Sequence, residues 1–155
     1  MNQKMDLSAI PDKTLELLRL TKVIVSPETF HVLRLSDDEW RGLLQNPEAS
    51  PSMDVPFYVF KDDWEITLVV CDADLKRIEG ALEKPRAEKN FRLMSFDAPL
   101  EFDVVGYLAA ITTILAASGI SILALTSFAR DHLLVRQSDL SKALKAFSGH
   151  VLEMC

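Results

Sequence analysis

Residues 104–129, VVGYLAAITTILAASGISILALTSFA, carry no charged side chain and change their hydrophobic period at Gly119. Before this glycine, apolar residues recur at helical spacing, at Val104, Leu108, Ile111 and Leu115. After it, apolar residues alternate with others as they do in a strand, at Ile120 and Ile122. The stretch therefore predicts a buried helix with a glycine at its C-terminal end, followed by a buried strand.

The same stretch is long enough to cross a lipid bilayer. Three of its features argue against a membrane span: the glycine in its middle, the six Ser and Thr residues along it, and the change of period. We therefore expect no membrane association.

Outward from this stretch, the second half of the chain predicts strands at residues 91–100, 120–128 and 132–135, and helices at 103–118 and 138–147, the last capped by Ser138. The first half predicts strands at 30–35, 57–60 and 65–71, and helices at 37–44 and 72–82. Ser36 and Glu39 form a capping box for the helix at 37–44. Residues 14–20 suit either a strand or a short helical turn.

The order β-α-β-β-α therefore occurs twice. It predicts an α+β protein made of two ferredoxin-like modules, each an antiparallel sheet with helices on one face. The charged segment 83–90 is the best boundary, which gives modules at residues 1–85 and 88–155. Strand 91–100 would close the first module, and residues 14–20 would return to close the second.

Composition excludes several classes of function. The 155 residues carry 17 basic and 23 acidic side chains, a net charge of −6, and no basic stripe for nucleic acid in either half. Cys71 and Cys155 lie far apart and outside any metal or redox spacing, and residues 1–6 hold no apolar signal segment. We expect a cytoplasmic protein that does not bind nucleic acid.

No active-site motif is present. The chain has neither a phosphate-binding glycine loop nor a nucleophile elbow. His31, His132 and His150 are scattered, and none lies at metal-ligand spacing from another His or Cys. The acidic residues 37–39 and 62–63 are interpreted as a helix cap and a turn. We therefore expect no enzymatic activity, no catalytic residue, no metal and no cofactor.

Three strings carry a family resemblance: FxxVGxLAxI at residues 102–111, LAxxGISI at 115–122 and TSFARDHLLV at 126–135. Together they resemble the core of an ACT domain. The third is similar to the STYxxDYxLV signature of the ACT branch that includes CASTOR-type arginine sensors and small bacterial tandem-ACT proteins. Residues 65–69 resemble a strand of the same branch, so the resemblance implies a tandem ACT protein whose first module is divergent.

The resemblance implies regulation rather than catalysis. ACT domains are βαββαβ modules that pair and bind amino acids or other small ligands at their interface, between the loop before the first helix and the end of the second strand. In this sequence those positions are Asp103, Val104, Val105, Gly106, Thr126, Ser127, Phe128 and Asp131. Ala129, Arg130 and His132 depart from the signature.

The chemistry of these positions suits an amino acid. A helix N-terminus presents unpaired amides and partial positive charge to a carboxylate, and Asp131 would pair with an ammonium group. Structural alternatives remain for three residues: Asp103 as the helix N-cap, Asp131 as a turn residue and Phe128 as a core residue.

Two functions follow from these observations. The first is a non-catalytic small-ligand sensor in the form of a homodimer that signals through a protein partner, and we expect its ligand to be an amino acid. The alternative is a ligand-free dimerisation or assembly module that acts through a protein partner.

Overall fold

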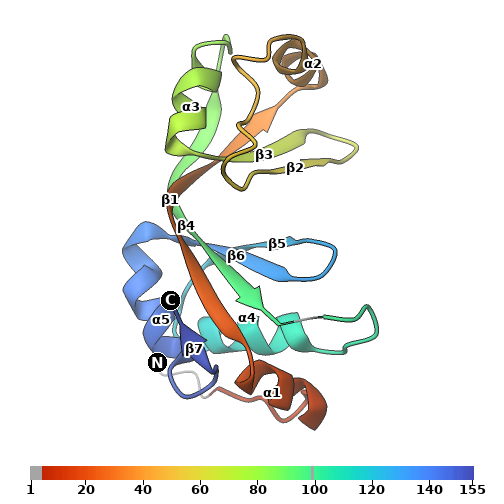
Figure 1. Ribbon diagram of the computed structural model, residues 1–155, viewed down its shortest axis with the longest axis vertical. Coiled ribbons are helices and arrows are strands. Elements are labelled where there is room, and N and C mark those ends of the chain that lie inside the picture. Colours follow the sequence, from red (N-terminus) through yellow and green to blue (C-terminus); the bar gives the residue numbers. More distant parts are fainter. Residues whose placement is uncertain (1–4, 99) are drawn as a thin grey trace. The chain divides into compact units, whose positions relative to one another are not determined.

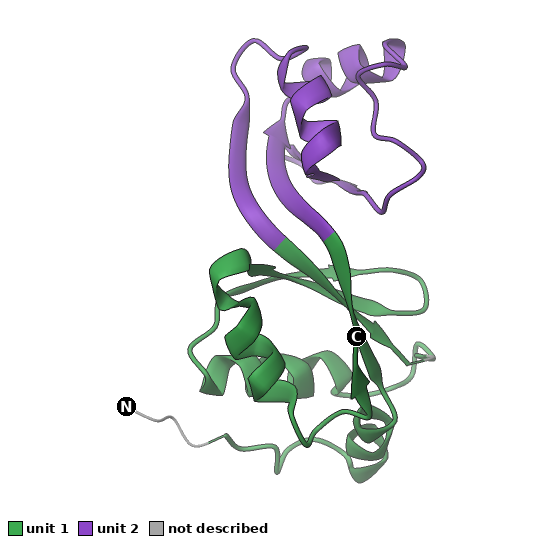
Figure 2. Ribbon diagram, turned by 60° about the vertical axis from the view of Figure 1, so that its left-hand side comes forward, with its two compact units in different colours: residues 1–27, 92–155 green, residues 28–91 purple. Residues whose placement is uncertain are grey.

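The computed structural model describes residues 5–98 and 100–155. The chain divides into two compact units (Figure 2): unit 1 comprises residues 1–27 and 92–155, and unit 2 comprises residues 28–91. Figure 1 follows the elements in chain order: α1 (Asp12–Arg19), β1 (Lys22–Leu35), α2 (Asp37–Gln45), β2 (Tyr58–Lys61), β3 (Ile66–Cys71), α3 (Asp72–Glu79), β4 (Arg86–Asp97), α4 (Tyr107–Ala117), β5 (Ile122–Thr126), β6 (Asp131–Arg136), η1 (Gln137–Asp139), α5 (Leu140–Phe147) and β7 (Glu153–Met154).

Unit 2 is a βαββαβ module. Its strands lie in the order β2-β3-β1-β4, and β3 runs antiparallel to both β1 and β2. The predicted capping box begins α2: the Glu39 amide donates to Ser36 Oγ at 3.2 Å, and the Ser36 amide donates to Glu39 Oε2 at 2.7 Å. Both helices bury apolar residues against the sheet in one cluster, which contains Leu33, Leu35, Leu43, Ile66, Leu68, Val70, Leu75 and Ile78.

Unit 1 has the same module order but takes its last strand from the start of the chain. Its strands lie in the order β1-β4-β6-β5, so the first part of β1 closes the module that begins with β4. The short β7 pairs in parallel with β1, with Lys22 opposite Glu153. Phe96 of β4 and Phe147 of α5 pack edge to face at 5.4 Å in its core, which also buries Met94, Tyr107, Ile111, Ile114, Leu115, Leu133 and Val135.

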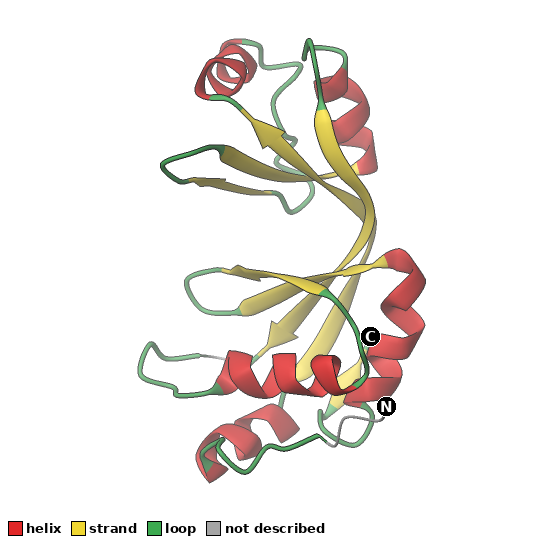
Figure 3. Cartoon of the chain, turned by 180° about the vertical axis from the view of Figure 1, so that it is seen from behind, coloured by secondary structure: helices red, strands yellow, loops and turns green. Residues whose placement is uncertain are grey.

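The α+β class and the repeated ferredoxin-like order are confirmed, with the helices and strands of Figure 3. The closure of unit 1 differs from the expectation: residues 14–20 lie in or just after α1, and β1 supplies the strand. The boundaries of the units also differ from the expected boundary at residues 85–88. β4 begins at Arg86 inside the charged segment, and residues 1–27 group with residues 92–155. β1 and β4 are long strands that each contribute residues to both units.

The helix of the opening stretch is confirmed, with a later start than expected. α4 begins at Tyr107, and its N-cap is Gly106 at φ 83°, so the interpretation of Asp103 as the N-cap is wrong. At the other end, the Gly119 amide donates to Ala116 O and the Ile120 amide to Leu115 O, which is the expected glycine cap.

Two further expectations are wrong. β5 is not a buried strand: it lies at the end of the strand order of unit 1, and most of its residues are exposed. Ser138 does not cap α5, because it lies within the short helix η1 that precedes α5. No helix in the described part of the chain is long and apolar enough to cross a membrane.

Candidate functional site

A hollow of about 420 Å³ lies in unit 1 between the loop before α4, the first turn of α4 and the turn that joins β5 to β6. We call it the α4 pocket. Six of the eight residues expected at a site line it: Val104, Gly106, Thr126, Ser127, Phe128 and Asp131. The other two, Asp103 and Val105, are exposed residues of the same loop and do not line the pocket.

The first turn of α4 faces this pocket with its backbone amides free of a side-chain cap. Gly106 adopts φ 83°, a left-handed conformation that glycine reaches without strain, and it has no side chain that could cap the helix. The Gly106 carbonyl accepts the Ala110 amide, so the helix is regular from its first residue. The uncapped amides and the helix dipole give this wall of the pocket a partial positive charge.

Helix α1 supports the loop from behind. Thr14 Oγ1 donates a 2.6 Å hydrogen bond to the Val105 carbonyl, and an added Cβ on Gly106 would meet Pro11 Cδ at 3.4 Å. The Tyr107 hydroxyl lies 2.6 Å from Thr21 Oγ1, and burial raises the pKa of Tyr107 to about 12. Sequence reasoning missed these contacts, because Thr14 lies 91 positions before its acceptor and no local pattern links the two.

Asp131 supplies a half-buried negative charge to the α4 pocket. The residue begins β6, pairs in register with Thr126 and is half-buried. Burial raises the pKa of its carboxyl group above the usual 3.8, and the nearby His132 has a smaller effect in the opposite direction. Among the described residues its side chain makes no hydrogen bond or ion pair, so the carboxylate is available to a cationic group of a ligand.

Hydrogen bonds to Ser127 hold the turn between β5 and β6. The Ser127 amide donates to the Arg130 carbonyl at 2.9 Å, and Ser127 Oγ donates to the same carbonyl at 3.1 Å. Ser127 Oγ also lies 3.2 Å from His132 Nε2, and His132 Nδ1 lies 2.8 Å from Ser95 Oγ. Since the Ser127 proton is already committed, Nε2 carries the imidazole proton and Nδ1 accepts from Ser95.

Arg130 lies on the rim of the α4 pocket, and its charge is already paired. Its Nε donates to Asp97 Oδ1 at 2.8 Å, and this ion pair also joins the turn to β4. The sequence shows no sign of this pairing, because the partners lie 33 positions apart on different elements. The departure from the ACT signature at Arg130 therefore adds no free positive charge to the pocket.

Two aromatic rings form the outer rim. Phe102, from the loop before α4, and Phe128, from the β5–β6 turn, meet edge to face with ring centroids 5.0 Å apart. Each is 83% exposed, so Phe128 is not the core residue that the structural alternative suggested. Large apolar side chains with this exposure mark a surface that gains stability when something covers it.

Unit 2 has a larger hollow of about 790 Å³ beside the start of α2. Here the helix N-terminus is occupied, because Ser36 and Glu39 form the capping box and Asp37 and Asp38 add negative charge. A ligand carboxylate at the start of α2 would meet these acids, so of the two helix starts that of α4 is the better candidate for an anionic group. Among the described residues, no three His, Cys, Asp or Glu side chains gather in a way that would hold a metal ion.

Comparison with known proteins gives the family context. Residues 86–148 match the family model described as the ACT domain. No curated protein matches the sequence significantly.

Solved structures show the same fold. The regulatory subunit of aspartate kinase from Thermus flavus has a TM-score of 0.66 at 13% identity, over 84% of this chain and 97% of that one. The ligand-free regulatory subunit of aspartate kinase from Thermus thermophilus has a TM-score of 0.64 at 12% identity, over 83% and 95%. A protein of unknown function from Vibrio cholerae, described as a possible transport protein, has a TM-score of 0.63 at 23% identity, over 86% and 93%.

Proposed function

From the ACT-domain match and the geometry of the α4 pocket, we propose that this chain is a non-catalytic regulatory protein that binds an amino acid. One observation carries the proposal: a single hollow holds both an uncapped helix N-terminus and the unpaired carboxylate of Asp131. An α-amino acid carries the two complementary charges, a carboxylate for the α4 amides and an ammonium group for Asp131. The regulatory subunits that share the fold support the same role.

We further propose a tandem ACT protein that acts as a homodimeric sensor in the cytoplasm, with the ligand held where the α4 pocket meets an ACT module of the second copy. β5 ends the strand order of unit 1, and an open strand edge is a surface on which a second chain can pair. Cys71 and Cys155 are free thiols, as in a reducing compartment. The bound state would be transmitted to a protein partner.

A thermal-shift screen against the twenty amino acids and common nucleotides tests the proposal. A ligand at 100 times its Kd stabilises the folded state by about 2.7 kcal/mol. For a chain of this length that corresponds to a rise in Tm of about 5–10 °C. Nucleotides serve as the negative set. Arg130, the cation on the rim of the α4 pocket, is already paired with Asp97 and is not available to their phosphates.

Asp131→Asn and Asp103→Asn form a matched pair for this screen. Asp131→Asn should abolish the shift while raising the Tm of the unliganded protein at neutral pH, because it removes a carboxylate that burial disfavours. Asp103→Asn removes the same charge from an exposed residue outside the pocket and should keep the full shift. An unchanged shift in Asp131→Asn would remove Asp131 from the site. A flat screen together with a stable dimer in sedimentation would favour the assembly module instead.

A further inference from the structure

We infer that the α4 pocket selects amino acids with an uncharged, apolar side chain, aliphatic or aromatic. This inference rests on the proposed function and concerns the part of the ligand that the two charged ends leave free. Three features carry it: the aromatic rim, the apolar floor, and charged groups that are either already paired or exposed to water.

The rim offers apolar surface on two sides. Phe102 and Phe128 come from different elements, the loop before α4 and the β5–β6 turn, and touch only edge to face at 5.0 Å. Both rings stay 83% exposed despite this contact. A ligand side chain that lies against them removes aromatic surface from water on the protein and apolar surface on the ligand, which favours binding.

The floor of the pocket is also apolar. Leu100, Val104 and Leu108 line the pocket and pack as half-buried residues against the core of unit 1. Core packing therefore holds this floor in place, and the three side chains that form it offer no hydrogen-bond partner to a polar group. A charged or strongly polar group placed here would lose its hydration without compensation.

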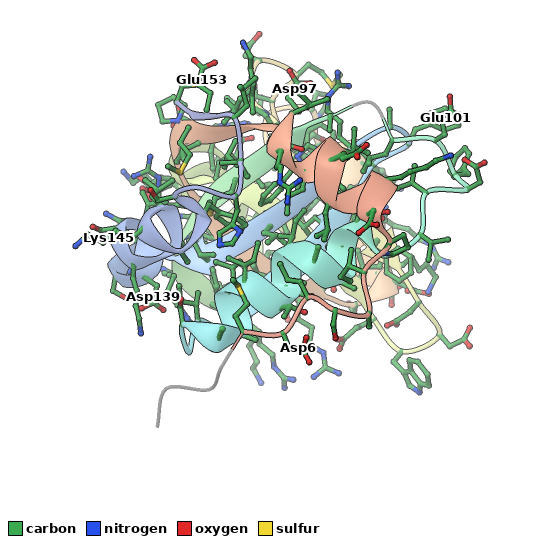
Figure 4. All side chains as sticks on the ribbon, turned by 90° about the horizontal axis from the view of Figure 1, so that it is seen from below. Asp6, Asp97, Glu101, Asp139, Lys145 and Glu153 are labelled. Atoms are coloured by element: carbon green, nitrogen blue, oxygen red, sulfur yellow. The ribbon has the colours of Figure 1, made fainter. Side chains whose placement is uncertain are left out.

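The charged groups around the pocket do not favour a charged side chain. The guanidinium of Arg130 is engaged by Asp97, and Asp131 is assigned to the α-ammonium group. Glu101 also lines the pocket, but its side chain is exposed to water on the loop before α4 (Figure 4). Water screens a charge in that position, so its attraction for a lysine or arginine side chain is weak.

Isothermal titration with five amino acids tests the inference: glycine, leucine, phenylalanine, lysine and aspartate. All five share the α-carboxylate and α-ammonium groups, so differences among them report the side-chain region alone. We expect leucine or phenylalanine to bind at least about tenfold more tightly than glycine, lysine or aspartate, since even one methylene in an apolar pocket is worth about tenfold or more.

Phe102→Ala and Phe128→Ala should each reduce that preference about tenfold while leaving the affinity for glycine unchanged. Phe60→Ala is the matched control: Phe60 is a 54% exposed phenylalanine on β2 of unit 2, and its removal should change no affinity.

The outcomes separate the two levels of the argument. Binding of all five amino acids with equal affinity, or tightest binding of lysine or aspartate, would overturn the selectivity and leave amino-acid binding intact. Loss of affinity for glycine in both phenylalanine variants would also overturn it, because the rings would then support the whole site. Absence of binding by every amino acid would overturn both the selectivity and the proposed function.

Discussion

At the scale of single residues, His132 is the clearest case of a side chain whose role depends on distant partners. It bridges Ser95 of β4 and Ser127 of the β5–β6 turn, and it needs an unprotonated Nδ1 to accept the Ser95 hydroxyl. Burial lowers the pKa of His132 below 6.5; Arg130 acts in the same direction, and Asp131 opposes both. The neutral imidazole therefore helps to fix the turn that carries Phe128 and Asp131.

The shifted pKa of His132 predicts a pH dependence of stability. Below pH 6.5 the unfolded chain takes up a proton at this histidine, while the folded protein resists it until the pH reaches the lower folded-state pKa. The unfolded state then binds more protons, so the free energy of unfolding should fall as the pH drops through this window. Asp131 has the opposite sign: its raised pKa costs stability as the pH rises above 3.8.

Urea denaturation of the wild type and of His132→Gln across this range measures the effect. Glutamine keeps a donor and an acceptor but does not titrate, so the variant should show a shallower loss of stability below pH 6.5. Asp131 is present in both proteins, so the effect of its burial cancels from the difference, while its electrostatic coupling to His132 is lost in the variant and is part of the measured effect. Parallel pH profiles for the two proteins would contradict the assigned role of His132.

The sequence alone places six of the eight expected residues around one pocket, because they belong to two short local segments. It does not reveal the residues that hold those segments. Thr14, Ser95 and Asp97 act across 91, 37 and 33 positions respectively. The misplaced cap at Asp103 has a related cause: support from α1 allows the helix to begin at an uncapped glycine, which local capping rules do not anticipate.

At the scale of elements, the order of helices and strands was predictable, while the lengths of β1 and β4 were not. The hydrophobic period identifies 30–35 and 91–100, yet β1 spans 14 residues and β4 begins at Arg86 within a charged segment. Most of residues 86–90 are exposed, so pairing in the sheet rather than burial makes them a strand. A pattern of apolar residues cannot show pairing of this kind.

Helix α1 predicts an asymmetry between the two termini. Deletion of residues 1–20 removes buried Leu18 and the Thr14 contact to the α4 loop. Deletion of residues 153–155 removes the short β7 pairing with β1, the exposed ion pair between Lys22 and Glu153, and the backbone bonds of Cys155. The first truncation should therefore lower the Tm far more than the second.

Calorimetry of both truncations beside the full chain provides the measurement. A Tm for the 1–20 deletion close to that of the 153–155 deletion would show that α1 is dispensable for unit 1. Restoration of the lost stability by a synthetic peptide of residues 1–20 would confirm that contacts of this segment are responsible.

At the scale of the whole molecule, the chain builds two separate cores. One cluster contains Ile111 of α4, and the other contains Ile78 of α3; both side chains are fully buried. Ile→Ala at either position should destabilise its own unit by about 2–5 kcal/mol, through lost burial and the cavity left behind. The two substitutions are chemically identical and serve as controls for each other.

Hydrogen exchange measured by mass spectrometry distinguishes the units. Ile111→Ala should accelerate exchange in α4, α5 and β6 while α2 and α3 stay protected, and Ile78→Ala should do the reverse. Equal acceleration in both units for either variant would mean that the two cores unfold as one cooperative body.

The origin of the last strand of unit 1 also matters during translation. Residues 28–91 of unit 2 form one uninterrupted segment, so the whole unit is present as soon as residue 91 has left the ribosome. Unit 1 joins the first 27 residues to the last 64, so its part of β1 is synthesised before the residues with which it packs. Val23 is fully buried in the finished protein. In a nascent chain that does not yet contain residues 92–155 it lacks the core that covers it, and we expect a chaperone to bind this early strand.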